Sequence, residues 1–134
     1  MELPHFLSLV SLYGSYLRRA FTASGLSSQT IDVDSETTIH FWGPIPKPTQ
    51  KPSLVFMHGF GPMALWQWRQ QVQFFSPHFN VYVPDLVFFG GSTTKSSERA
   101  ETFQAVSVGK LLEILGVNRF YVMGTSYGGL VAYH

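Results

Sequence analysis

Cysteine is absent from the sequence, which excludes a disulfide framework, a thiolate zinc site and a cysteine nucleophile. Charged residues are scarce, at 13% of the 134 residues against roughly 25% in soluble domains, whereas apolar residues make up 45%. A net charge of +1 provides no basic surface for phosphates, so we expect no nucleic-acid partner. Chemistry must rest on serine, histidine and carboxylates, and no pattern predicts a metal or a cofactor.

A long apolar run is also missing. The uncharged stretch from Leu3 to Leu17 has about 15 residues, whereas a membrane-spanning helix needs about 20. Arg18 and Arg19 follow the stretch, which is the wrong charge order for a signal peptide. Its helical spacing predicts an amphipathic helix within residues 1–28, packed on its own domain or a partner, or lying in a membrane interface through residues 3–21. Localisation stays open between cytoplasmic and peripheral on a membrane.

Residues 29–134 alternate between strand and helix patterns, and we expect them to form one incomplete α/β domain. Alternation on either side of Asp34 to Glu36 predicts an antiparallel hairpin. Short apolar runs predict strands buried on both faces, hence parallel, with helices between them. The fold class is therefore α/β, with a mostly parallel sheet and helices on both faces. The expected hairpin spans 30–42, the further strands 53–57, 81–83 and 120–123, and the helices 65–75 and 103–115.

The last strand pattern runs into Gly124-Thr-Ser126-Tyr127-Gly128-Gly129, a G-x-S-x-G motif between a strand and a small-residue helix start. In that context the motif predicts a sharp turn that presents Ser126 as a nucleophile. Gly124 and Gly128 avoid a steric conflict across the turn. The Tyr127 N–H and the helix dipole would then face a developing oxyanion.

An earlier strand pattern ends in His58-Gly59-Phe60-Gly61-Pro62, and the Phe60 N–H can serve as the second oxyanion donor. Gly59 and Gly61 permit close backbone approach. We interpret His58 as a residue that orients this loop rather than as a base. Asp85, at the end of another strand pattern, is interpreted in the same way, as a brace for the loop that follows it.

These three segments, HGFGP, DLVFFGGS and GTSYGG, resemble the first half of the α/β-hydrolase superfamily, over roughly residues 30–134. Within it the sequence looks most like plant relatives of the monoacylglycerol lipase-type hydrolases. The resemblance implies hydrolysis of a carboxylic or lipid ester through an acyl enzyme on Ser126, with oxyanion donors at Phe60 and Tyr127. One departure is Val87, where the superfamily's D-x-P-G-x-G-x-S pattern has proline.

The superfamily orders its triad as serine, acid, histidine, and the eight residues after Ser126 include no acid. Along a helix, His134 would lie about 12 Å from Ser126, beyond the roughly 3 Å reach of a general base. His5, His40 and His78 lie upstream and are interpreted as surface or packing residues. We therefore expect an N-terminal fragment that is inactive alone and prone to self-association.

Two alternatives remain open at this point. One is a non-catalytic binding or regulatory fragment that pairs through an exposed strand edge. The other is a carbon–carbon bond hydrolase or a hormone-receptor-like relative, because both carry serine at this turn. Epoxide hydrolases and haloalkane dehalogenases of the same fold carry aspartate there, so Ser126 disfavours them.

Overall fold

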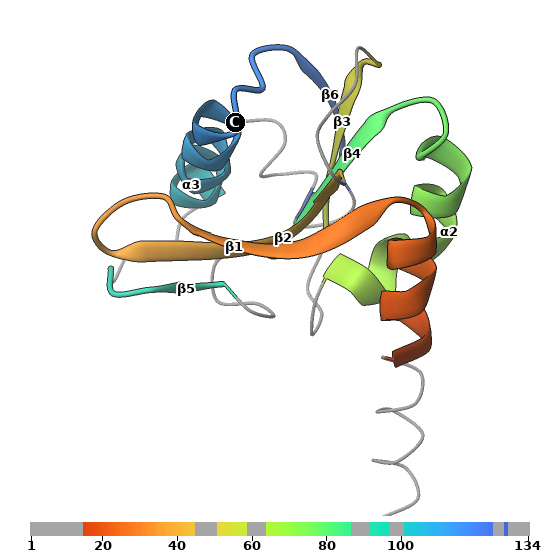
Figure 1. The fold of residues 1–134 in the computed structure, drawn as a ribbon. Helices are drawn as coiled ribbons and strands as arrows, with labels where there is room; N and C mark the ends of the chain where they lie inside the picture. The colour runs from red at the N-terminus through yellow and green to blue at the C-terminus, as the bar shows by residue number, and fades with distance from the viewer. Residues whose placement is uncertain are drawn as a thin grey trace, which may run out of the picture.

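The N-terminal helix packs on the protein's own sheet. A computed structural model describes residues 15–44, 51–58, 64–86, 92–96, 101–124 and 128, and the helix occupies residues 15–23 (Figure 1). Leu17 and Phe21 are fully buried, and the Phe21 ring contacts Trp42 edge to face at 5.3 Å between centroids. Arg18 and Arg19 are exposed on its other side. Along these residues the apolar face of the predicted amphipathic helix therefore packs internally.

The predicted hairpin is confirmed, with a longer first strand. β1 (Leu26–Asp32) pairs antiparallel with β2 (Thr37–Pro44), and Ile31 lies opposite Ile39. In the turn, the Asp34 carboxylate accepts hydrogen bonds from the backbone N–H groups of Glu36 and Thr37. The strand begins before Thr30 because β2 pairs with the three polar residues 27–29, which have no alternating apolar pattern of their own.

The described strands form a mixed sheet in the order β1-β2-β4-β3-β6. β3 is parallel to both β4 and β6, whereas β2 runs antiparallel to β4. The expected combination of parallel strands with an antiparallel hairpin is confirmed. A two-residue strand, β5, which the sequence did not predict, pairs with the first two residues of β2, Thr37 and Thr38. Beyond the hairpin, the strands are β3 (Ser53–Met57), β4 (Asn80–Pro84), β5 (Thr93–Thr94) and β6 (Phe120–Gly124).

Helices cover both faces of the sheet, as predicted. Alternate residues of β3 point to opposite sides, so Phe56 packs with α2 (Ala64–Phe75) while Val55 packs with α3 (Glu101–Ile114). Phe56 is fully buried and stacks on Trp68 at 4.7 Å between ring centroids. Figure 1 shows α3 on one side of the sheet and α2 with the N-terminal helix on the other.

Three further observations concern the end of α3, the surface of β6 and the length of the helices. The chain leaves α3 through Gly116, whose φ of +75° is the left-handed conformation that glycine favours after a helix. β6 carries three exposed apolar side chains, Phe120, Tyr121 and Val122. No helix in the described part of the chain is long and apolar enough to cross a membrane.

Candidate active site

The predicted site residues divide into two groups. Four lie in the described structure, at the ends of neighbouring strands: His58 follows β3, Asp85 follows β4, Gly124 ends β6 and Gly128 comes four residues later. The other five lie outside the described residues, so their predicted roles stay predictions: Gly59, Phe60, Gly61, Ser126 and Tyr127.

The two motif segments leave the sheet at the same edge. β3 and β6 are parallel neighbours, and Met57 lies opposite Gly124 in their register. Parallel strands present their carboxyl ends together, and ligand sites of open α/β sheets form outside those ends. The chain segments that follow Met57 and Gly124 therefore start side by side.

Gly128 shows how tightly these segments meet. Its conformation is helical and its backbone is buried against the end of β3. A Cβ atom added at Gly128 would overlap the carbonyl oxygens of Met57 and His58, which are backbone atoms that cannot rotate away. The steric conflict that the sequence predicts across the turn involves residues outside the described part of the chain and stays a prediction. The described contact is with the neighbouring strand, and it allows no side chain at this position.

His58 joins the ends of β3 and β4. Its side chain is 1% exposed, and Nε2 accepts a hydrogen bond of 2.9 Å from the backbone N–H of Leu86. An accepting Nε2 in a neutral imidazole leaves the proton on Nδ1. The contact fixes the spacing between the HGFGP loop and the end of β4, which fits an orienting residue rather than a base.

Replacing His58 by alanine should lower the free energy of unfolding by about 1–3 kcal/mol, because the buried Leu86 N–H loses its acceptor. Urea denaturation followed by tryptophan fluorescence measures the change. His78 is exposed and provides the matched control, for which we expect a change within about 0.5 kcal/mol. Equal effects of the two alanine variants would contradict the orienting contact.

Hydrogen bonds of Asp85 link the two ends of the segment that follows β4. Its carbonyl oxygen accepts a 2.5 Å hydrogen bond from the Ser92 hydroxyl, which in turn accepts one of 3.0 Å from the His40 N–H. The Asp85 N–H donates to the His40 carbonyl at 2.9 Å, and its carboxylate lies 2.8 Å from His40 Nδ1. Asp85 and Ser92 are the two ends of the DLVFFGGS segment, so these bonds hold both ends of the loop against β2.

His40 makes contacts that the sequence does not predict. The sequence pattern is that of a surface or packing residue, yet both ring nitrogens have partners: Asp85 at Nδ1 and Ser28 at Nε2. The alternating pattern places His40 on the more polar face of its strand, but that pattern does not reveal which strand lies beside it. In the part of the chain that the structure describes, no group of three or more histidine, aspartate or glutamate side chains is placed to hold a metal ion.

Comparisons with known proteins agree with this geometry. A sequence family described as the alpha/beta hydrolase fold matches residues 52–134, more than half of the chain. A pimeloyl-[acyl-carrier protein] methyl ester esterase of Vibrio vulnificus is 38% identical over 85 residues, covering 63% of this chain and 31% of that protein. A soluble epoxide hydrolase of a Corynebacterium species is 31% identical over 81 residues, covering 60% of this chain and 28% of that protein.

A crystal structure of a membrane phospholipase A, described as a bacterial virulence factor, is similar over 94% of this chain and 39% of that one, with a TM-score of 0.76 and 26% identity. The chain thus spans about a third of the length of the relatives it matches. Because the family match covers both the HGFGP and the GTSYGG segments, and because the sheet brings their strands together, this chain belongs to the α/β-hydrolase fold family.

Proposed function

We propose that the chain supplies the nucleophilic half of a serine hydrolase, with Ser126 attacking a carboxylic ester. The observation that carries the proposal is the contact of Gly128 with the carbonyls of Met57 and His58. It joins the last glycine of the G-x-S-x-G motif to the strand end from which the HGFGP segment departs. The flanks of both motif segments therefore meet at one edge, as a shared oxyanion site requires.

The proposed chemistry is acyl transfer. The Ser126 hydroxyl adds to the ester carbonyl, the N–H groups of Phe60 and Tyr127 stabilise the oxyanion, and the alcohol leaves. Water then hydrolyses the acyl group on Ser126 and releases the acid. Within the 134 residues the one histidine after Ser126 is His134, which would lie about 12 Å away along a helix, so we expect Ser126 to lack the base that makes its hydroxyl reactive.

The relatives support an ester as the substrate class. One is named as a methyl ester esterase and a solved neighbour as a phospholipase. Two others are named as epoxide hydrolases, but serine rather than aspartate at position 126 favours ester chemistry here. The resemblance to plant monoacylglycerol lipase-type hydrolases stays a prediction from the sequence motifs, and on that prediction we extend the proposal to lipid esters. A carbon–carbon bond hydrolase remains the alternative with the same nucleophile.

The test supplies the missing base from solution. The purified chain should hydrolyse a short-chain nitrophenyl ester no faster than its Ser126→Ala variant. With added imidazole as a general base, an acyl group should accumulate on Ser126 and be found by peptide mass mapping. Peptide mapping is the required readout, because imidazole also hydrolyses the ester directly.

Two results would contradict the proposal in different ways. Absence of an acyl group on Ser126 at every imidazole concentration, in a chain shown to be folded, would remove the nucleophile assignment. Rapid turnover without imidazole that disappears in Ser126→Ala would keep the nucleophile but show that the 134 residues already contain its base.

A further inference from the structure

A second serine, far from the motif in sequence, has the contacts of an activated nucleophile. The Ser28 hydroxyl oxygen lies 2.6 Å from His40 Nε2, and His40 Nδ1 lies 2.8 Å from the Asp85 carboxylate. The three residues come from β1, β2 and the end of β4, which are consecutive in the sheet order. Serine, histidine and aspartate bonded in this order form the arrangement that activates a serine hydroxyl, whatever their order in the chain.

The direction of the hydrogen bonds suits a base at His40. An ionised carboxylate accepts only, so Asp85 holds the imidazole proton on Nδ1. In the neutral ring Nε2 then has a lone pair, and Ser28 donates its hydroxyl proton to it. This is the tautomer in which histidine can take a proton from serine.

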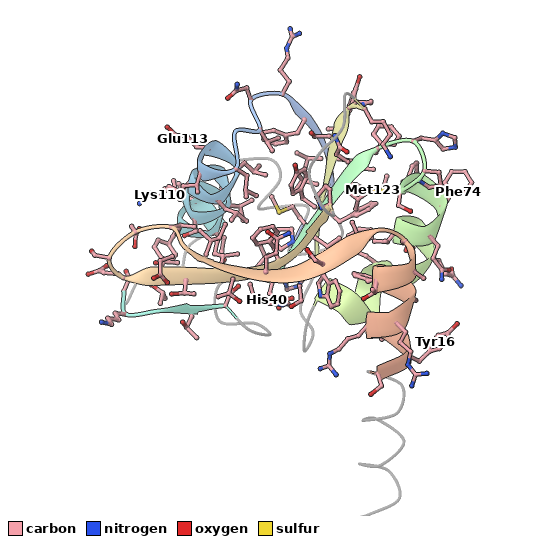
Figure 2. The ribbon with its side chains drawn as sticks, viewed as in Figure 1. Tyr16, His40, Phe74, Lys110, Glu113 and Met123 are labelled. Atoms are coloured by element: carbon pink, nitrogen blue, oxygen red, sulfur yellow. The ribbon has the colours of Figure 1, made fainter. Side chains whose placement is uncertain are left out.

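Burial decreases along the chain of contacts. The Asp85 side chain is 4% exposed, the His40 side chain 20%, and Ser28 is exposed on its strand. The carboxylate is therefore shielded from water while the hydroxyl is open to reagents. In Figure 2, His40 is labelled beside the hairpin strands, between β5 and the N-terminal helix.

Backbone contacts make the base rigid. The His40 N–H donates to Ser92, and the His40 carbonyl accepts from the Asp85 N–H at 2.9 Å. The ring itself contacts Trp42 edge to face, at 6.3 Å between ring centroids. A base held in place before the reaction loses little conformational freedom when it acts.

We propose that Ser28 is a second nucleophilic site, which accepts activated acyl and phosphoryl groups with His40 as its base and Asp85 as a positioning residue. With a fluorophosphonate, Ser28 Oγ forms a bond to phosphorus as the phosphorus–fluorine bond breaks. Fluoride leaves, and the hydroxyl proton passes to His40 Nε2 and then to solvent. Because the site needs only a nucleophile and a base, its substrates are those whose leaving groups depart without assistance.

The experiment uses the full chain carrying Ser126→Ala, so that labelling cannot come from the proposed active site. After exposure to a fluorophosphonate, peptide mass mapping gives the labelling rate of each serine. Ser35 lies exposed in the turn of the same hairpin and serves as the internal reference. We expect Ser28 to react at least about 100-fold faster than Ser35, the usual contribution of a positioned base.

Variants separate a nucleophilic site from a merely exposed serine. His40→Gln should bring the Ser28 rate down to that of Ser35, whereas Ser35→Ala should leave it unchanged. Ser28 is exposed, so Ser28→Ala should keep the fold, and it should abolish labelling of the peptide that contains residue 28. For Asp85, the rate should fall in Asp85→Asn and return in part in Asp85→Glu.

The pH dependence of the Ser28 labelling rate distinguishes a base at His40 from a residue with a purely structural role. The Ser28 rate should fall as the pH is lowered, because a protonated His40 cannot accept the hydroxyl proton. Among the described residues, two carboxylates contact this face of β2: Asp32 at Thr38 and Asp85 at His40. The N-terminal helix, which packs on the same sheet, exposes Arg18 and Arg19. Equal rates at Ser28 and Ser35, or a Ser28 rate that His40→Gln leaves unchanged, would overturn the proposal.

Discussion

Replacing Gly128 by alanine is expected to lower the free energy of unfolding by about 3 kcal/mol or more, the upper end of what overpacking a tight site costs. The added methyl group would lie on the carbonyl oxygens of Met57 and His58, and neither can move without shifting the end of β3. Urea denaturation followed by the fluorescence of the buried residues Trp42 and Trp68 measures the loss.

Gly109 provides a control with the opposite sign. It lies in α3 with no atom within 4 Å of an added Cβ. Alanine is the better helix former by roughly 1 kcal/mol, so Gly109→Ala should raise the free energy of unfolding slightly. If Gly128→Ala were as harmless as Gly109→Ala, the contact that brings the two motif segments together would be wrong, and the proposed function would lose its main support.

Substitution of Ser126 should decide the chemistry. Ser126→Ala should remove the imidazole-dependent acylation of residue 126 completely, because no nucleophile remains there. Ser126→Cys should be acylated without imidazole, since a thiol is a few per cent ionised at pH 7 and intrinsically more nucleophilic than a hydroxyl. The chain has no native cysteine, so every thiol adduct in this variant belongs to position 126.

A second cysteine variant controls for simple exposure. Ser35→Cys places a thiol in the exposed hairpin turn, where no oxyanion donors are proposed. A cysteine beside a helix N-terminus has a lowered pKa, so the thiol at 126 should ionise at lower pH than the thiol at 35. Identical titration of the two thiols, measured by alkylation against pH, would argue against the proposed strand-to-helix turn.

Much of the fold could be read from local patterns. The alternation around Asp34 predicted the hairpin, and apolar runs predicted the three strands that carry the motif segments. These features depend on neighbours along the chain, which a periodic pattern records directly. The start of β1 was placed too late, because the three residues after Leu26 are polar and owe their strand conformation to pairing with β2.

The candidate site was only partly predictable for the same reason. His58 was predicted to be an orienting residue because it stands in a strand-end motif, and the structure adds its bond to Leu86. His40 carried no such signal. Its importance comes from Ser28 and Asp85, which lie 12 and 45 positions away in the sequence.

By itself the sequence determined the succession of strands and helices, the glycine-flanked serine at 126 and the absence of an acid after it. Only the tertiary structure decided that β2 lies between β1 and β4, and that Gly128 rests on the end of β3. The physical reason is that residue spacing encodes which face of an element is apolar. Which elements become neighbours depends on how those faces pack together, and that choice brings Ser28, His40 and Asp85 into contact.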